Sequence, residues 1–394
     1  ANLVDDEFAE ADWAAIEDAL EVAAGMDLVC LDRKLGRDPA NAYVCRLYVP
    51  QADARIALAW AKLLEPAEGS PDFRTLQLPD WDEREGRRRR IRILPEAGLT
   101  FVLGSDYTGE AKKSFLRLFM YRAKQQGGLG LHAGSKRVRV DRDGHLETIG
   151  QAFLGLSATG KSTLTGHGCW LEEPEGAEML QDDVCALLPD GRVVGSEGKG
   201  LYIKTDGLDE DEQPQLYRAA TNESAVFENV TVYEDGTVDF HDTELTRNGR
   251  AVIQRACLES AHEDIDLDEL DQVFFITRNP LMPPVARLSP EQAAVAFMLG
   301  ESIQTSAGDP DAAGESIRVV GTNPFIMGSK GEEGNRFREL VRDLDVECYV
   351  LNTGCVGTSD DPRDVGVRES VTILREIARG SVQWREDDRT GMTV

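Results

Sequence analysis

The chain has 394 residues, of which 41% are hydrophobic and 29% charged, so it can form two globular domains and does not resemble a disordered chain. Its net charge is −28, with 71 acidic and 43 basic residues, which argues against nucleic-acid or anionic-membrane partners. The seven cysteines are dispersed without zinc-ligand or C-x-x-C spacing, a pattern typical of reduced thiols in a cytoplasm.

The basic residues include only ten lysines. An excess of Asp and Glu along the whole chain, with few lysines, indicates a surface adapted to high salt, where screening removes self-repulsion. An ordinary acidic cytosolic protein is the alternative. The first residues lack the features of a signal peptide, and no apolar run approaches a membrane span. We therefore expect a cytoplasmic protein whose local basic sites bind anionic ligands.

Apolar periodicity and turn residues predict a mixed α/β structure in the N-terminal region. The predicted helices cover 7–25, 54–64 and 109–124, and the predicted strands cover 28–31, 43–49, 92–94 and 99–103. Residues 66–80 read as a proline-containing connection. The basic run at 87–90 could be a nucleic-acid patch or a solvated strand edge that pairs with nearby acids, and the acidity of the chain favours the second.

The C-terminal region alternates strands with short helices. Strands are predicted over 129–132, 137–140, 150–154, 184–188, 200–203, 230–232, 273–276 and 348–351, and helices over 290–299, 332–344 and 370–379. Gly127 and Gly128 interrupt the pattern after the third helix and mark the predicted domain boundary. We expect domains over 1–127 and 128–394.

The most informative motif lies between a predicted strand and a predicted helix. It reads G-x-x-x-x-G-K-[ST] and consists of Gly155, Leu156, Ser157, Ala158, Thr159, Gly160, Lys161, Ser162 and Thr163. In that context the backbone N–H groups of the turn point at one anionic group. Lys161 would reach the β- and γ-phosphates of a nucleotide, and Ser162 would bind Mg²⁺. The alternative is a glycine-rich turn that binds nothing.

Three further features could serve such a loop. Asp182 and Asp183 lie about twenty residues after it; such an acid binds the metal in phosphate-loop enzymes, although acid pairs are also common in turns. Lys112 and Lys113 open a predicted helix, where cations oppose the helix dipole, and this favours a role with an anion or a metal. His132 ends a predicted strand, and taken alone it is better explained as a satisfied polar group than as a ligand.

In their order along the chain these features resemble the ATP-type phosphoenolpyruvate carboxykinases. The matching segments are 36–39, 107–113, 131–132, 155–164, 182–183, 196–205, 228–240, 245–250, 283–292 and 351–354. Their collinearity is more specific than any single match. The resemblance implies a mixed α/β, two-domain carboxykinase fold, in which 1–127 bind the substrate and 128–394 form a phosphate-loop domain for nucleotide and metal.

The resemblance also implies a role for each matching metal and phosphate ligand. Lys113, His132 and Asp183 would bind a catalytic metal ion, Mn²⁺ by preference in this family. Lys161 and Ser162 would hold the nucleotide phosphates together with Mg²⁺. A lysine ligand must be neutral, and the neighbouring ammonium group and the metal would lower its pKa.

The remaining matching residues would contact the substrate, the nucleotide or metal-bound water. The implied roles are carboxylate and phosphoryl binding by Arg37 and Arg250, lining of the oxyacid site by Tyr107 and Lys112, support of metal-bound waters by Asp182, positive charge near the phosphates from Lys204, and contact with the adenine nucleotide by Arg363 and Ser370.

The activity implied by the resemblance is ATP-dependent decarboxylation of oxaloacetate and phosphorylation of the resulting enolate to phosphoenolpyruvate, in gluconeogenesis. Cations and divalent metals stabilise an enolate, and phosphoryl transfer depends on positioning and charge neutralisation. The expected cofactors are ATP/ADP, Mn²⁺ and Mg²⁺.

Two alternative functions remain. The first is a kinase of the same fold that phosphorylates another hydroxy acid or an alcohol without decarboxylation, and the second is a non-catalytic nucleotide-binding regulator. The oligomeric state is open, with a monomer favoured.

The sequence departs from the family pattern in several places. It is shorter than the usual member, Ala158 replaces a glycine of the loop, and 133–136 differ from the family segment after the metal-binding histidine. Residues 303–325 are polar and acidic where the family has a mobile lid. Lid closure excludes water and commits the substrate, so this segment favours the kinase alternative, whereas Arg37 and Tyr107 favour the carboxykinase. We expect a divergent, shortened, salt-adapted member of haloarchaeal type.

Overall fold

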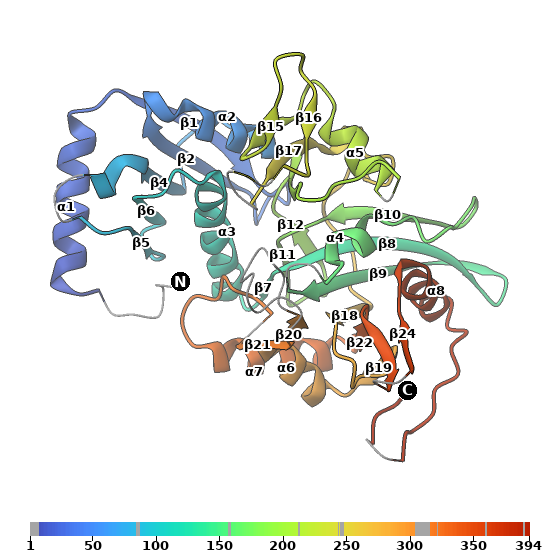
Figure 1. Cartoon of the computed structure of the whole chain (residues 1–394). Coiled ribbons are helices and arrows are strands. Elements are labelled where there is room, and N and C mark those ends of the chain that lie inside the picture. The colour runs from blue at the N-terminus through green and yellow to red at the C-terminus, as the bar shows by residue number, and fades with distance from the viewer. Residues whose placement is uncertain are drawn as a thin grey trace. The chain divides into compact units, whose positions relative to one another are not determined.

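The computed structural model describes residues 8–83, 87–156, 159–211, 213–242, 244, 248–303, 316–320, 322–358, 361–388 and 391–394. The chain forms two compact units (Figure 1). The first unit comprises 1–122 and 196–259, and the second comprises 123–195 and 260–394. The division after residue 122 falls five residues before the predicted boundary. In contrast, the prediction assigned 196–259 to the second domain, and the structure groups this segment with the first unit.

The first unit is built on a six-stranded mixed sheet in the order β3-β1-β2-β4-β6-β5. The strands are β1 (Leu28–Leu35), β2 (Tyr43–Pro50), β3 (Glu65–Pro66), β4 (Phe73–Leu78), β5 (Arg90–Leu94) and β6 (Leu99–Leu103). Helix α1 (Glu10–Ala24) packs on it through Ile16 and Ala19, which form a core with Leu78 and Phe101. Helices α2 (Ala54–Leu63) and α3 (Thr108–Gln125) contact each other through Trp60 and Phe115, whose rings stack at 4.9 Å.

Residues 196–259 belong to the first unit because their strands pack against α2. Strands β13 (Gly200–Lys204), β14 (Val226–Glu228) and β17 (Arg250–Gln254) form a three-stranded antiparallel sheet in the order β13-β17-β14. The Lys199 N–H donates to the Leu63 carbonyl at 3.1 Å. A Cβ on Gly200 would lie 2.5 Å from the Lys62 carbonyl oxygen, so glycine permits this close approach. Such contacts between distant segments leave no periodic signal in the sequence.

The second unit is built on a six-stranded sheet in the order β10-β8-β9-β18-β22-β19. Its strands are β8 (Ala133–Arg142), β9 (His145–Gly155), β10 (Gly176–Gln181), β18 (Gln272–Thr277), β19 (Val285–Leu288) and β22 (Glu347–Asn352). Strand β18 is central and pairs in parallel with both β9 and β22. Strands β7 (Leu129–Leu131), β11 (Cys185–Leu187) and β12 (Val193–Gly195) form a smaller sheet. Buried parallel strands read as continuous apolar runs, which is why β9, β18 and β22 were predicted.

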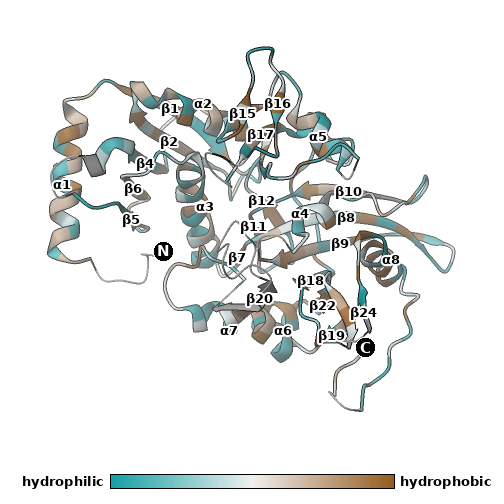
Figure 2. Cartoon of the chain, viewed as in Figure 1, coloured by the Kyte–Doolittle hydropathy of each residue, from teal (hydrophilic) through white to brown (hydrophobic). Residues whose placement is uncertain are grey.

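Helices cover both faces of this sheet. Its strands are hydrophobic where the helices pack, whereas parts of β8, β9 and β10 are hydrophilic (Figure 2). Helices α6 (Pro290–Met298) and α7 (Lys330–Asp343) pack on one face, where the Phe297 and Phe337 rings stack at 4.7 Å. Helices α4 (Lys161–Gly166) and α8 (Val367–Ala378) pack on the other face through Leu164 and Leu374. A hydrophobic layer on each face is the arrangement that α/β sheets require.

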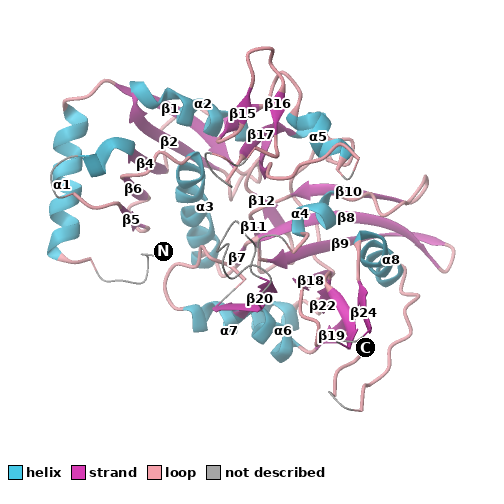
Figure 3. Ribbon diagram, viewed as in Figure 1, coloured by secondary structure: helices cyan, strands magenta, loops and turns pink. Residues whose placement is uncertain are grey.

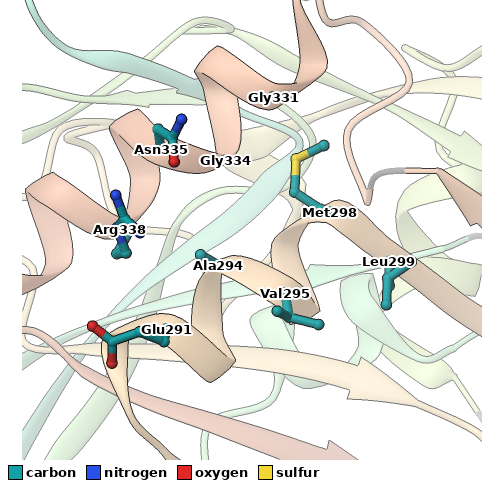
Figure 4. A pocket seen from close by; sticks show the side chains of 9 residues that line it. All are labelled: Glu291, Ala294, Val295, Met298, Leu299, Gly331, Gly334, Asn335 and Arg338. Carbon is teal, nitrogen blue, oxygen red and sulfur yellow. The ribbon is translucent and has the colours of Figure 1, made fainter.

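A hollow of about 470 Å³ lies between α6 and α7 (Figure 4). It is lined by Glu291, Ala294, Val295, Met298, Leu299, Gly331, Gly334, Asn335 and Arg338. A Cβ on Gly334 would lie 2.7 Å from Met298 Cγ, so glycine lets the two helices cross closely at this point. We interpret the hollow as a consequence of this glycine-lined crossing.

The mixed α/β class is confirmed, and the remaining elements are short (Figure 3). They are η1 (Gln51–Asp53), η2 (Pro79–Glu83), α5 (Pro214–Ala220), β15 (Thr231–Val232), β16 (Val238–Asp239), η3 (Arg255–Cys257), β20 (Leu299–Ile303), β21 (Ser316–Val320), β23 (Cys355–Thr358) and β24 (Asp361–Asp364). The prediction of a connection over 66–80 was wrong in part, because β4 forms there. Residues 304–315 and 321 of the predicted lid segment lie outside the described residues.

The arginine run at the start of β5 pairs with acids of α1, as the favoured interpretation predicted. Arg87 and Asp18 form an ion pair at 2.5 Å, and Arg90 forms another with Asp12 at 2.5 Å. The guanidinium carbon of Arg87 also lies 4.3 Å from the ring centroid of Trp81.

A long apolar helix that could cross a bilayer is absent from the described part of the chain.

Candidate functional site

The predicted phosphate-binding motif forms a turn between β9 and α4. Strand β9 ends at Gly155 and α4 begins at Lys161. Gly160 precedes the helix with φ of +95°, a conformation that favours glycine. A Cβ on Gly155 would lie 2.6 Å from Thr159 Oγ1. The strand, turn and helix that the motif requires are therefore present, whereas Ser157 and Ala158 lie outside the described residues.

Two predicted ligands lie together in the second unit because their strands are paired. Strand β7 ends one residue before His132, and its last residue, Leu131, pairs with Cys185 of β11. This register places His132 beside Asp183, which lies just before β11, and His132 Nε2 is 3.1 Å from Asp183 Oδ1. The Lys161 ammonium donates to the same oxygen at 3.5 Å. Ser162 is exposed in the first turn of α4, and Asp182 is 7% exposed.

The second contact of His132 comes from the segment 303–325, which was predicted only as an altered lid. His132 Nδ1 lies 3.2 Å from the carbonyl oxygen of Thr322, and the edge of the Phe325 ring packs at 5.2 Å between centroids. Both residues lie near the end of this segment. Its divergence from the family pattern gave no signal for this contact.

The electrostatics of His132 suit a metal ligand. Burial and the nearby Lys161 ammonium lower its pKa, which favours the neutral ring. If Nδ1–H donates to the Thr322 carbonyl, the Nε2 lone pair faces a carboxylate oxygen of Asp183. Metal-binding histidines are commonly oriented by such a second hydrogen bond. In that tautomer the imidazole nitrogen and the carboxylate oxygen, 3.1 Å apart, would both offer electron pairs to a cation of the kind that the resemblance implies.

The described residues contain no cluster of three or more His, Cys, Asp and Glu side chains with metal-binding placement. The predicted set includes one histidine and one aspartate; its other members are Lys113, in the first unit, and Ser162. His132, Ser162 and Asp183 all belong to the second unit, and only Lys113 belongs to the first.

In the first unit the predicted cations gather around the Tyr202 ring. Lys112 Nζ lies 5.6 Å from the ring centroid, and the guanidinium carbon of Arg250 lies 5.8 Å from it. The Tyr107 ring packs at 6.1 Å between centroids. Lys112 also forms an ion pair with Glu197 at 2.9 Å, and both side chains are nearly fully buried, at 4% and 2% exposure. We call Tyr107, Lys112, Glu197, Tyr202 and Arg250 the Tyr202 cluster.

Other predicted residues of the first unit have polar partners of their own. Lys113 is 32% exposed and lies 5.2 Å from the Tyr107 ring centroid. Arg37 donates to Glu65 at 2.8 Å and to the Gly198 carbonyl at 2.8 Å. Lys204 pairs with Asp206 at 3.0 Å. In the second unit, Arg363 is exposed on β24, and Ser370 is buried in α8, where its hydroxyl donates to the Gly366 carbonyl at 2.8 Å.

No role was predicted from the sequence for the acids and the tyrosine that organise the Tyr202 cluster. The Tyr202 hydroxyl donates to Glu228, and burial is the main cause of the raised pKa of Tyr202, with Tyr107 and Glu228 adding to it. Glu228 also accepts from the backbone N–H of Thr108 at 2.9 Å, at the start of α3. Tyr202 and Glu228 lie within segments that matched the family, but a match alone does not show which side chains face the cations.

Comparison with known proteins places the chain in a family. The sequence model of the family described as phosphoenolpyruvate carboxykinase matches residues 2–394. A phosphoenolpyruvate carboxykinase (ATP) of Aeropyrum pernix is 40% identical over 83% of this chain and 64% of its own length. Proteins with the same name from Rhizobium etli and Rhodopseudomonas palustris are 28% and 30% identical over 96% and 97% of the chain, and each is covered over 71% of its length.

The chain belongs to the ATP-type phosphoenolpyruvate carboxykinase family. The resemblance stated from the sequence is thus confirmed at the level of the family. The chain spans about two thirds of the length of these relatives, 64% for the protein from Aeropyrum pernix and 71% for the two others.

Proposed function

We propose that this chain is an ATP-dependent phosphoenolpyruvate carboxykinase. In the proposed reaction the bond between the carboxylate carbon and C3 of oxaloacetate breaks, and CO₂ leaves. The electron pair forms an enolate, whose oxygen attacks the γ-phosphorus of ATP. The bond from the γ-phosphorus to the bridging oxygen breaks in the same displacement, and the products are phosphoenolpyruvate, ADP and CO₂.

The observation that carries the proposal is the convergence of Lys161 and His132 on one carboxylate oxygen of Asp183, at 3.5 and 3.1 Å. It supports a phosphate-binding lysine and a pair of metal ligands at one place in the second unit. Charge neutralisation and positioning are what phosphoryl transfer requires. Membership of the family, whose relatives are named for this reaction, gives the second line of support.

We assign Lys161 and the backbone of the 155–160 turn to the nucleotide phosphates, and Ser162 to Mg²⁺. Lys113, His132 and Asp183 are assigned to Mn²⁺, with Asp182 supporting its water ligands. When bound, these divalent cations would supply Lewis-acid stabilisation of the developing enolate and phosphate charge.

The Tyr202 cluster supports an oxyacid site in the first unit, because the face of an aromatic ring attracts cations and so gathers the Lys112 and Arg250 charges at one place. Arg250, Tyr107 and Lys112 would bind the carboxylates of oxaloacetate, together with Arg37. The Glu197 carboxylate would hold the Lys112 ammonium in place and keep it charged. We assign Lys204, Arg363 and Ser370 to the nucleotide on the resemblance alone.

The test uses the whole chain in high salt, supplied with oxaloacetate, ATP, Mg²⁺ and Mn²⁺, and follows phosphoenolpyruvate by ³¹P NMR. Lys113→Ala is compared with Lys124→Ala, which removes a lysine of the same helix that pairs with Glu333 at 3.0 Å. The proposal predicts Mn²⁺-dependent product, its loss in Lys113→Ala and its retention in Lys124→Ala. ATP binding without any product would overturn the carboxykinase and turn attention to other hydroxy acids and alcohols as phosphoryl acceptors.

A further inference from the structure

The side chain of Lys136 lies in the second unit, and the chemistry described above does not use it. It lies on β8, four residues after His132, and its exposure is 0%. Lysine is almost never fully buried unless its ammonium group has partners, because removing a charge from water is costly. A buried lysine therefore points to a specific set of contacts.

The contacts of Lys136 satisfy the ammonium group. Its Nζ donates to the Leu164 carbonyl at 2.5 Å, to the His167 carbonyl at 2.7 Å and to Cys169 Sγ at 3.6 Å. A lysine ammonium has three N–H donors, so these acceptors account for all of them. The ring of Phe153, with its centroid 5.4 Å away, adds a favourable environment for a cation.

These acceptors lie at the end of the helix that carries the phosphate-binding residues. Leu164 is in the last turn of α4, and His167 directly follows the helix. A cation near the C-terminal carbonyl groups of a helix is favourable. Because α4 has only six residues, its end lies fewer than about two turns from Lys161, and a shift at one end must move the other.

A second contact joins the same strand to the same helix. Gly134 of β8 packs against Thr165 of α4, and a Cβ on this glycine would lie 2.3 Å from Thr165 Oγ1. Strand β8 thus meets α4 through a close steric contact and, two residues further on, through the hydrogen bonds of Lys136. The strand begins directly after His132, so the residue assigned to Mn²⁺ is covalently joined to its first residue.

We propose that Lys136 is a positioning residue of the nucleotide site. It fixes the end of α4 against β8 and thereby sets the positions of Lys161 and Ser162 relative to His132. The inference rests on the proposed binding of nucleotide at the start of α4. The residue reaches no substrate and takes part in no chemical step; it acts through the helix.

The test is Lys136→Met, which keeps the apolar stem and removes every donor. In the whole chain at high salt, the dissociation constant for MgATP should rise about tenfold to a hundredfold, the scale expected when aligned groups are displaced. The KM for oxaloacetate should stay unchanged. Amide hydrogen exchange of residues 159–167 should become faster without any ligand, and this readout is independent of activity.

The matched control is Val138→Ala, on the same face of β8. Val138 packs with Val140 and Ile149, so this change should lower stability and leave MgATP affinity and exchange at 159–167 unchanged. A folded Lys136→Met protein with wild-type MgATP affinity would overturn the inference. An equal rise in the KM for oxaloacetate would also overturn it, because that result indicates general distortion.

A third variant keeps the inference testable if Lys136→Met does not fold. Cys169→Ala removes one of the three acceptors and should raise the MgATP dissociation constant about threefold, as the loss of one weak hydrogen bond would. No change in affinity or in exchange at 159–167 would count against the inference. A wild-type chain that does not bind MgATP would instead overturn the proposed function, and the exchange measurement alone would then decide whether Lys136 holds α4.

Discussion

The phosphate-binding turn of the second unit and the Tyr202 cluster of the first unit both concentrate charge, but they are assembled differently. In the turn, Lys161 belongs to a nine-residue motif that is contiguous in sequence, and its partner Asp183 lies between β10 and β11. In the Tyr202 cluster, the groups come from α3, β13 and β17 and from the residues just before α3 and β13, and they span 143 residues of the chain, from Tyr107 to Arg250.

This difference determines how each region tolerates change. The phosphate-binding turn depends on backbone conformation and on the close packing of α4 against β8, so small steric changes at this contact should disturb the turn. The Tyr202 cluster depends on buried charges, because Lys112 and Glu197 are 4% and 2% exposed. Removing one member of a buried pair leaves the other charge without compensation, which costs more than the pair itself contributes.

The largest effect is expected from Lys161→Ala. The ammonium group is the proposed phosphate ligand, and loss of such a group from a transition state costs about a thousandfold or more in kcat/KM. Steady-state kinetics in high salt would measure it, with Lys330→Ala at the start of α7 as the charge-matched control. A loss below about tenfold would mean that the turn does not carry the phosphoryl chemistry.

The next effect should come from the Tyr202 cluster. Glu197→Gln removes the negative charge that lies 2.9 Å from the buried Lys112 ammonium, and the free energy of unfolding should fall by about 3–5 kcal/mol. Urea unfolding at high salt would measure this change. The matched control is Asp190→Asn, which breaks the pair between Asp190 and Arg192, 2.9 Å apart and 54% and 42% exposed; its cost should stay below about 1 kcal/mol. Equal losses would show that burial of the Lys112 pair carries no penalty.

These two regions also show what could be predicted from the sequence. The motif predicted Lys161 at a helix start because the residues that form the turn are neighbours in the chain. The last part of β9 and most of β18 and β22 were predicted because the buried parts of parallel strands are continuous apolar runs. The pairing of Leu131 with Cys185, which brings His132 beside Asp183, depends on strand register between distant segments, and periodicity does not contain it.

The first unit was predicted less completely for the same physical reason. The sheet of β13, β14 and β17 packs on α2, from which its nearest strand is separated by more than a hundred residues, and the predicted domain boundary therefore missed it. Glu197 and Glu228 could not be separated from the other acids of a chain with 71 of them. Adaptation to high salt and the metal assignments stay predictions.

A third effect would sharpen the steric side of the comparison. Gly134→Ala places a methyl group 2.3 Å from Thr165 Oγ1, so α4 must move away from β8, at a cost of about 1–3 kcal/mol in stability. MgATP affinity should fall with it and recover in part when Thr165→Gly is added. Calorimetric titration would measure the MgATP affinity, and urea unfolding would measure the stability.

The control for this change is Gly176→Ala on the neighbouring strand β10. A Cβ at Gly176 has no atom within 4 Å among the described residues, so stability and MgATP affinity should be kept. If both alanine variants behaved alike, close packing of α4 would not be what the nucleotide site depends on.

The smallest effect is expected from Tyr202→Phe, which separates the two ways in which this tyrosine holds its neighbours. The change removes the hydrogen bond to Glu228 but keeps the aromatic face over which Lys112 and Arg250 lie. Stability should fall by about 1 kcal/mol, the usual contribution of one hydrogen bond, and turnover should change by less than about threefold, because the cations remain oriented by the ring. Tyr202→Leu should cost more in both measurements. Equal losses in the two variants would show that the hydroxyl, acting through Glu228 on the start of α3, organises the Tyr202 cluster and that the ring face does not.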